Sequence, residues 1–278
     1  MKITSRHLKP LVSSLGPRRR QPSRIGAANL LRCLLIALTS IAVLEAFPSE
    51  ARAQQSFAGV WRAGTDPYYL WIGANWNDFK NKWQQLSNES LRLVDIETYD
   101  DGGQRKFAGV WRAGNDGHYL WVDANWDHFK AKWEELAKQN LRLTVLRTYE
   151  ENGQRLYVGV WRAGTDGYYL WQGVDWNNFT AKWAELSKQN LRLVDFETYT
   201  DGSTRKYIGV WRSGSDGHYL WAGVNWANFR AKWEELAKQH LRLTVLKTYV
   251  DGGERKYAGV WREGGDGYYL WVGADYEN

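Results

Sequence analysis

The apolar positions of this chain follow a set of spacings that returns after 50 residues. In its first copy, Phe57 to Arg62 (FAGVWR) is rich in aromatic and β-branched residues, a composition typical of a strand. The Gly64 to Pro67 cluster predicts a turn. A second short strand is predicted at Tyr68 to Ile72.

If these two strands pair across their turn, Trp61 faces Tyr69 and Gly59 faces Trp71. A glycine opposite a tryptophan leaves room for the indole ring to lie over bare backbone. We therefore expect the tryptophans of the strands to pack across a hairpin within one copy.

The spacing then changes to that of a helix. Asn75 suits a helix N-cap, and four apolar residues after it recur at intervals of 3, 4 and 3 residues, which places them on one helical face: Trp76, Phe79, Trp83 and Leu86. This pattern predicts a helix from about Trp76 to Asn88. A third strand is predicted at Leu91 to Tyr99.

The third strand is predicted to form a hairpin with the first strand of the next copy. Asp101 to Gln104 is a turn sequence, and the second copy has Asn152-Gly153 there, a strong signal for a two-residue hairpin. In the corresponding register, Val94, Ile96 and Thr98 share a sheet face with Phe107, Gly109 and Trp111, while Leu91, Leu93, Ala108 and Val110 form the other, also mostly apolar, face.

The period is free of insertions, and all 18 tryptophans fall into four columns. The columns are Trp61, Trp111, Trp161, Trp211 and Trp261; Trp71, Trp121, Trp171, Trp221 and Trp271; Trp76, Trp126, Trp176 and Trp226; and Trp83, Trp133, Trp183 and Trp233. The chain is therefore predicted to be a tandem repeat protein, with repeats at 57–106, 107–156, 157–206 and 207–256 and a half repeat at 257–278.

One repeat is too short to cover both faces of its own sheet. Stacking on neighbours is then required, as in solenoids and toroids. We predict an α+β fold in which strand-strand-helix-strand units form a toroid or solenoid-like array. The pattern leaves the strand order open, and the half repeat could cap the array, close a ring or continue into another molecule.

The copies also alternate with a period of 100 residues. Asp95 and Glu97 in the first copy become Val145 and Arg147 in the second, and the third and fourth copies repeat this change; Tyr68 and Tyr168 alternate in the same way with His118 and His218. Duplication of a two-copy ancestor explains the pattern. The alternative is that acidic and basic strands of neighbouring copies form ion pairs, each contributing about 0 to 1 kcal/mol if exposed.

Residues 1–53 differ from the repeats and have the pattern of a secretory signal peptide. A basic stretch precedes an apolar run from Leu34 to Leu44, and Ala51-Arg52-Ala53 forms an A-x-A cleavage site. The run has 11 residues, whereas a membrane-spanning helix needs about 20. We therefore expect cleavage near Ala53 and a secreted protein, extracellular or periplasmic, of residues 54–278.

Removal of this leader changes the charge of the chain. The leader holds nine of the 37 Lys and Arg and two of the 31 Asp and Glu, which leaves 28 positive against 29 negative residues. A nucleic acid or an anionic membrane is therefore not expected as a partner. The one cysteine, Cys33, lies in the leader, so the repeats are expected to fold without disulfides.

The motif GVWRxGxDGxYLW, followed by W-x-x-F-x-x-x-W-x-x-L and LRL…TY, resembles the bacterial tandem repeat domain family, whose repeats also occur in the amino-terminal domain of fungal polyglycine hydrolases. The resemblance covers residues 57–278. It implies a toroidal accessory domain, often found beside a hydrolase domain, and it supplies no catalytic residues. A second domain is not evident in this sequence, which is a departure from that arrangement.

Catalytic chemistry is not indicated by the repeats. His118 and His128 are ten residues apart, which matches no usual metal-ligand spacing, and neither His118 nor His218 has a suitable nucleophile beside it. Recurrent aspartates such as Asp66 favour a shared role in a turn over a calcium site, because each loop offers one clear carboxylate. We expect no enzyme activity, no cofactor and no metal.

The aromatic residues allow two interpretations. They form the core, with arginines stacked on indoles for stability, or some of them form repeated shallow platforms that suit a sugar or a peptide backbone. The platform hypothesis names as ligand-binding candidates Trp61, Arg62, Asp66, Tyr69, Trp111, Arg112, Asp116, His118, Trp161, Arg162, Asp166, Trp211, Arg212, Asp216 and His218.

Two classes of function follow. The chain is a multivalent binding module for an extracellular glycan or protein segment, or it is a structural repeat that associates with itself or with another chain. A substrate-recognition domain separated from a hydrolase is a further alternative.

Overall fold

The protein is described by a computed structural model over residues 56–274. The predicted signal peptide, its cleavage site and residues 275–278 lie outside this range. Within it, the helices are α1 (Trp76–Asn88), α2 (Trp126–Lys138), α3 (Trp176–Lys188) and α4 (Trp226–Lys238). The strands are β1 (Phe57–Arg62), β2 (Tyr68–Ala74), β3 (Leu91–Asp101), β4 (Gln104–Ala113), β5 (His118–Ala124), β6 (Leu141–Glu151), β7 (Gln154–Ala163), β8 (Tyr168–Val174), β9 (Leu191–Asp201), β10 (Thr204–Ser213), β11 (His218–Val224), β12 (Leu241–Asp251), β13 (Glu254–Glu263) and β14 (Tyr268–Ala274).

The helices begin where the sequence predicts and for the predicted reason. In α1, the Asn75 side chain accepts a hydrogen bond from the Asp78 amide at 2.9 Å, which satisfies one free donor of the first turn. Phe79 and Leu86 are buried on one face. Ser90, just beyond the helix, has a φ of 58° and so turns the chain into β3 in the left-handed conformation. No helix within residues 56–274 is long and apolar enough to cross a membrane.

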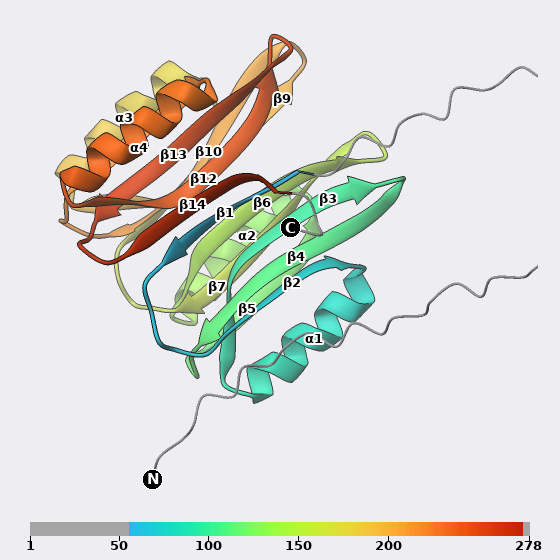
Figure 1. Cartoon of the computed structure of the whole chain (residues 1–278). Helices are drawn as coiled ribbons and strands as arrows, with labels where there is room; N and C mark the ends of the chain where they lie inside the picture. The colour runs from blue at the N-terminus through green and yellow to red at the C-terminus, as the bar shows by residue number, and fades with distance from the viewer. Residues whose placement is uncertain (1–55, 275–278) are drawn as a thin grey trace, which may run out of the picture. The chain divides into compact units, whose positions relative to one another are not determined.

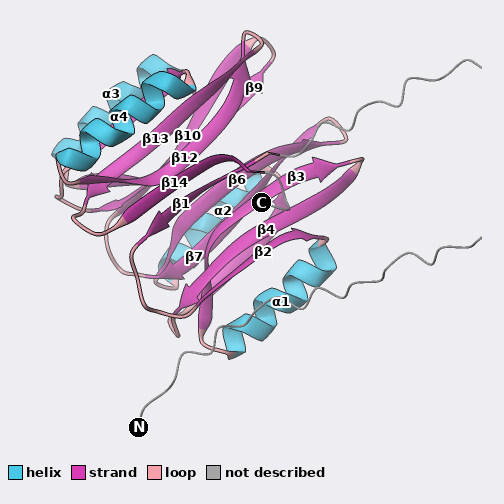
Figure 2. Ribbon diagram, in the orientation of Figure 1, coloured by secondary structure: helices cyan, strands magenta, loops and turns pink. Residues whose placement is uncertain are grey.

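The chain forms four three-stranded antiparallel sheets, each covered by one helix (Figure 2). In the first sheet the order is β2-β4-β3, and the other three sheets repeat it. The two outer strands of each sheet belong to one copy of the sequence, while the central strand begins the next copy. The unpredicted strand order therefore interlocks successive copies through backbone hydrogen bonds.

This order corrects the predicted hairpin between the first two strands of a copy. Tyr69 lies opposite Trp111 and Trp71 lies opposite Gly109, so the predicted register is present but with the strand 50 residues further on. Periodicity cannot separate the two pairings, because both strands carry the same sequence. The identity of the partner copy is a tertiary property.

The hairpin of β3 and β4 is confirmed, with one irregularity. Ile96 lies opposite Gly109 and Thr98 opposite Phe107, as expected. A bulge at Val94 then shifts the register, so that Leu93 lies opposite Trp111. The strand therefore contributes Leu93 to the core, where the sequence pattern had placed Val94.

Gly109 on the central strand β4 leaves space for the indole ring of Trp111 on the same strand. A Cβ added to Gly109 would lie 2.6 Å from the far edge of the Trp111 indole and 2.9 Å from the Phe79 ring. The ring that covers the glycine is thus Trp111, two residues further along, and not Trp71 across the ladder. The position needs glycine because the indole and the helix occupy the space of a side chain.

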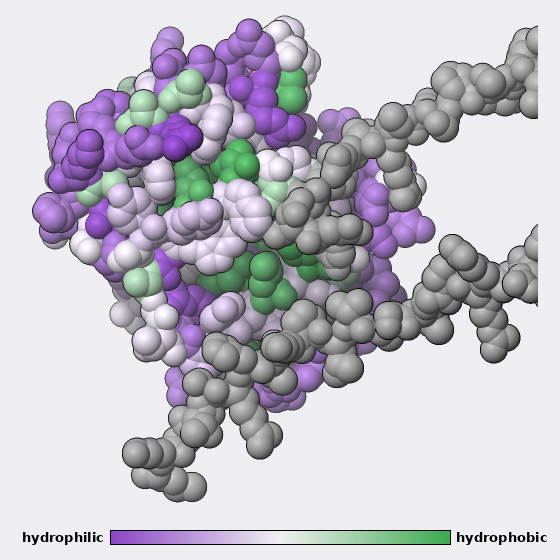
Figure 3. All heavy atoms as spheres, viewed as in Figure 1, coloured by the Kyte–Doolittle hydropathy of each residue, from purple (hydrophilic) through white to green (hydrophobic). Residues whose placement is uncertain are grey.

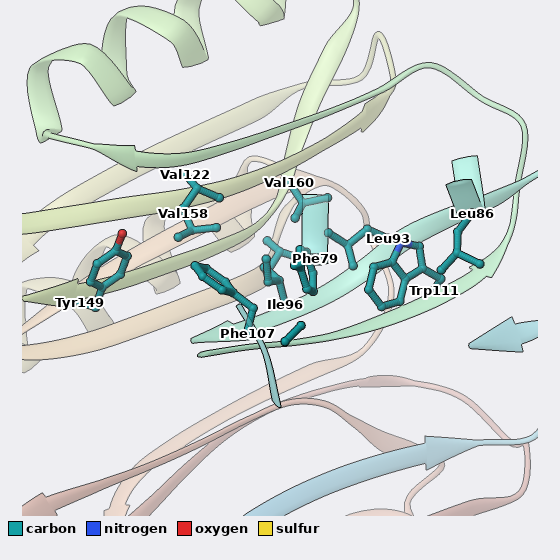
Figure 4. Close-up of a cluster of buried hydrophobic side chains, with 12 residues drawn as sticks. Phe79, Leu86, Leu93, Ile96, Phe107, Trp111, Val122, Tyr149, Val158 and Val160 are labelled. Carbon is teal, nitrogen blue, oxygen red and sulfur yellow. The ribbon is translucent and has the colours of Figure 1, made fainter. Parts of the chain in front are cut away.

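The core under α1 contains residues from three successive sequence copies (Figure 4). Phe79, Leu93 and Trp111 pack under α1, and Val158 and Val160 of β7 complete the same cluster. The third strands of neighbouring copies also contact one another, β3 with β6, β6 with β9 and β9 with β12. The expected stacking between repeats is therefore present, and it buries both faces of the central strands β7, β10 and β13.

The two ends of the described chain meet. β1 pairs antiparallel with β14, with Gly59 opposite Trp271 and Arg62 opposite Tyr268, the register of the other sheets (Figure 1). Of the two predicted forms, the closed array is therefore the one observed. The half repeat closes it against the start, and the fifth sheet has only these two strands among residues 56–274.

Candidate functional site

Four of the candidate platform tryptophans are core residues. Trp111, Trp161, Trp211 and Trp261 are fully buried between their sheet and the covering helix. Their rings offer no surface to a ligand, which corrects the platform hypothesis for these positions. Trp61, the same column in the two-stranded sheet, is exposed.

The candidate arginines and aspartates join successive copies. Arg112 Nε donates to Asp66 Oδ2 at 2.8 Å, and its second nitrogen bonds the other carboxylate oxygen. This two-point geometry is the strong form of an Arg-carboxylate pair. The same pairs form between Arg162 and Asp116, Arg212 and Asp166, Arg262 and Asp216, and, at the closure of the array, Arg62 and Asp266.

The guanidinium groups hold these carboxylates ionised. The hydrogen bond from Arg162 lowers the pKa of Asp116, and that from Arg62 lowers the pKa of Asp266 to about 2. The sequence correctly assigned the aspartates a shared role at a turn. It missed the partner, which lies 46 residues away in the next copy.

A second arginine column, unnoticed in the sequence, lies in the LRL motif of the third strand. Arg92 is buried; its Nε donates to the Asp116 carbonyl at 2.7 Å, and a terminal nitrogen donates to the Ser87 carbonyl at 2.9 Å. A cation at a helix C-terminus satisfies free carbonyls and suits the helix dipole. Arg142, Arg192 and Arg242 make the same contacts. The one signal was the arginine between two core leucines.

The alternation of tyrosine and histidine is matched on the preceding helix. His118 Nε2 lies 3.0 Å from the Ser87 hydroxyl, and His218 lies 2.8 Å from Ser187. Burial lowers the pKa of both imidazoles, and the nearby Arg92 or Arg192 adds to this. The two histidines therefore stay neutral at pH 7, and each contacts a serine of the preceding helix.

Where the strand has tyrosine, the helix has alanine. Tyr168 packs edge-on against Trp133, and Arg142 lies 4.3 Å from its ring centre. Position 137 of that helix is Ala, as is position 237 before Tyr268. The smaller residue accompanies the larger ring, so the 100-residue period has a packing basis at this contact.

The acidic and basic third strands form the ion pairs that the sequence offered as an alternative. Arg147 contacts Asp95, Glu97 at 2.6 Å and Asp195 at 2.7 Å. Lys247 contacts Glu97 and Glu197, each at 3.1 Å. Pairing across copies is therefore confirmed.

These pairs are not simply exposed, because both cations and Asp195 are buried, while Asp95 and Glu97 are about half exposed. Arg147, Lys247 and Asp195 have little solvent contact. Burial raises the pKa of Asp195 to about 6 despite the attraction of Arg147 and Lys247. Because desolvation offsets much of the attraction, the cluster specifies which strands meet more than it adds stability.

A repeated aromatic surface remains partly accessible after this packing. Trp71, Trp121, Trp171 and Trp221 are half-buried, each beside a half-buried tyrosine of the same strand. Lys182 Nζ lies 5.1 Å from the Trp171 ring centre and 5.8 Å from that of Tyr169. Lys82, Lys132 and Lys232 take the same place in the other copies. Of the predicted candidates, Tyr69 belongs to this surface.

The comparison with protein families agrees with the division into sheets. The family described as "Polyglycine hydrolase-like, structural repeat" matches residues 65–113, 120–163, 165–213 and 219–264. These segments take up more than half of the chain. The chain belongs to this family. A search of curated proteins finds no significant match.

Each matched segment corresponds to one three-stranded sheet. The first, 65–113, covers β2, α1, β3 and β4. The period is that read from the sequence, but a segment of this family begins at the turn after β1. Within residues 56–274, no three His, Cys, Asp or Glu side chains are grouped as metal ligands.

Proposed function

We propose that this chain is an exported, non-catalytic binding module that presents four weak and equivalent sites to an extracellular glycan or protein segment. The observation that carries the proposal is the fourfold surface of Trp171, Tyr169 and Lys182 and its counterparts. A half-buried indole beside a cation suits the apolar face and hydroxyl rim of a sugar. It suits a peptide backbone as well.

Several such sites on one molecule would bind a repeating ligand more tightly than one site does. One shallow surface binds weakly, but a polymeric ligand that contacts two or more of them gains affinity through effective concentration. The other conspicuous polar groups, the Arg-Asp pairs and the buried ion cluster, bind one another and so leave this surface as the best candidate.

The family suggests a second candidate, a recognition domain that acts for a separate hydrolase. The support is the family's description as a structural repeat similar to that of polyglycine hydrolases. In both cases the repeats bind and do not catalyse. Export to the cell exterior or periplasm rests on the leader pattern of residues 1–53.

A glycan and peptide array, followed by titration against polymeric and monomeric forms of each hit, tests the proposal. Trp71→Ala, Trp121→Ala, Trp171→Ala and Trp221→Ala are made singly and together, with His128→Ala, an exposed helix position, as control. Affinity for a polymer is expected to fall about tenfold or more as sites are removed stepwise, while monomer affinity per site stays constant. Binding that survives the quadruple variant, or no binding across the array, would contradict it.

A further inference from the structure

The fifth sheet lacks two elements that every other sheet has. The strands β1 and β14 occupy the places of β4 and β2. Among residues 56–274, no helix covers this sheet and no strand pairs with the second edge of β1 (Figure 1). The unfilled position corresponds to residues 76–101 of the first copy.

In the fifth sheet, aromatic side chains that a helix covers in the other sheets are exposed. Trp61 is 45% exposed, whereas Trp111, its counterpart, is 0% exposed. Tyr269 and Trp271 are exposed beside it. In Figure 3, weakly polar and apolar residues lie in the middle of the view, over β1 and β14, with hydrophilic residues around them. An aromatic face of this kind on a folded protein marks an interaction site.

The absent strand leaves a second surface on the first copy. Val158 and Val160 of β7 are fully buried against the core under α1, but their counterparts Ala108 and Val110 are partly exposed. The Asp95 side chain is 48% exposed, against 4% for Asp195. By repeat equivalence, a third strand added to the edge of β1 would contact Ala108, Val110 and Asp95. These surfaces therefore surround one unfilled position.

We propose that this position is a docking site for a helix-strand segment of a partner polypeptide, of the type found in the second and fourth copies. The partner's helix would cover Trp61 and Trp271, and its strand would pair with the free edge of β1, a form of strand addition. This interaction surface is independent of the proposed glycan or peptide sites.

Charge decides one property of the partner. The central cluster holds the carboxylates of Asp95, Glu97, Asp195 and Glu197 but only the two cations Arg147 and Lys247. Asp95 is the counterpart of Asp195, which contacts Arg147 of the preceding third strand, so a third strand at the open position would lie beside Asp95. A strand with Arg or Lys at the position of residue 147 offsets the excess of carboxylates, whereas an acidic strand adds repulsion.

Side-chain size decides a second property independently. Tyr68 is 76% exposed, and none of the helices described in residues 56–274 packs on it as α2 and α4 pack on Tyr168 and Tyr268. Those helices carry Ala137 and Ala237, and serine occurs only before histidine. A helix with alanine at this position therefore fits Tyr68. Both contacts select the same type of copy.

A second copy of this chain fits the position poorly. Its helices already cover their own sheets, so it offers no free helix-strand segment.

Synthetic peptides from the chain itself provide the test. Peptide 125–151 carries Ala137 and Arg147, and peptide 175–201 carries Ser187 and Glu197 in the same frame. We expect labelled peptide 125–151 to bind the full chain at one site, measured by fluorescence anisotropy. Two controls should bind more weakly, by about tenfold or more. One is peptide 125–151 with Val145→Asp and Arg147→Glu, and the other is peptide 175–201.

The proposal would be overturned if peptides 125–151 and 175–201 bound with equal affinity. It would also be overturned if peptide 125–151 did not bind at about 100 μM. A dimer of the chain alone in sedimentation, lost on Trp271→Glu, would also overturn it in favour of a second copy. The Trp61→Ser variant should bind peptide 125–151 more weakly, and its circular dichroism should match that of the wild-type chain.

Covalent attachment removes the dependence on peptide folding. Residue 278 is equivalent to residue 128, so a copy of 129–151 added after Asn278 supplies the segment in frame. This extension is expected to raise the melting temperature and to abolish peptide binding. A copy of 179–201 serves as control and should raise the melting temperature less. No difference between the two extensions would overturn the proposal.

Discussion

At the residue scale, the repeated glycine of the central strand is defined by its neighbours. In β10, a Cβ on Gly209 would lie 2.1 Å from the Trp211 indole and 2.9 Å from Phe179. Both rings are fully buried, so neither has space to move. In β1 the same glycine, Gly59, would place a Cβ 2.3 Å from Trp61, but this ring borders solvent.

Gly209→Ala is therefore expected to cost more stability than Gly59→Ala. An added methyl group in a closed core costs about 1 to 3 kcal/mol, and a ring that can swing into solvent relieves most of that strain. The free energy of unfolding from urea denaturation measures both variants. Equal losses would show that the helix does not fix the indole.

At the element scale, helix and following strand are matched in pairs. Ser187 on α3 bonds His218 on β11, whereas Ala237 on α4 lies before Tyr268 on β14. These pairs join elements of neighbouring copies. The 100-residue alternation of the sequence is therefore also an alternation of contacts.

A double-mutant cycle checks this match. Ser187→Ala leaves the half-buried imidazole of His218 without its hydroxyl partner, and His218→Tyr brings a larger ring against the serine, so each alone should cost about 1 kcal/mol or more. The double variant restores the combination of the other copies and should be closer to wild type, with a coupling of about 0.5 kcal/mol or more. Additive losses in urea denaturation would mean that the two positions are independent.

The element scale also shows what the repeat pattern predicts well. Asn75, Phe79 and Leu86 predict the helix with its observed bounds, because a cap and a 3.6-residue period are local properties. The bulge at Val94 was not predicted, because a run of apolar residues on both faces gives no register signal. The buried Arg92 was missed for a similar reason: its partners, Ser87 and Asp116, are near only in the fold.

At the scale of the whole molecule, a cluster of charges around the buried Arg147 and Lys247 joins all four full copies. Arg147 contacts Asp95 and Glu97 of the first copy and Asp195 of the third. Lys247 contacts Glu97, 150 residues away. The cluster thus connects the beginning and the end of the closed array.

Arg147→Ala is expected to cost about 3 to 5 kcal/mol at pH 7, because it leaves Asp195 buried without its partner. The pKa of Asp195 is about 6 in the fold and its unfolded value is 3.8, so the buried carboxylate is increasingly protonated as the pH falls below 6. The cost should therefore be smaller at pH 5 than at pH 7. Urea denaturation at both values, with the exposed Lys130→Ala as control, measures it; a cost independent of pH would contradict the role of Asp195.

The sequence by itself determined the period, the helices, the strand register outside the bulge and the family, because each follows from spacings that recur along 50 residues. Only the tertiary structure decided which copy supplies the partner. Identical strands satisfy the same register within a copy or between copies, and the choice depends on how rings and charges far apart in the chain can be buried together. For that reason Trp111 and Asp66, plausible as ligand residues in the sequence, are a core side chain and one half of a bond between copies.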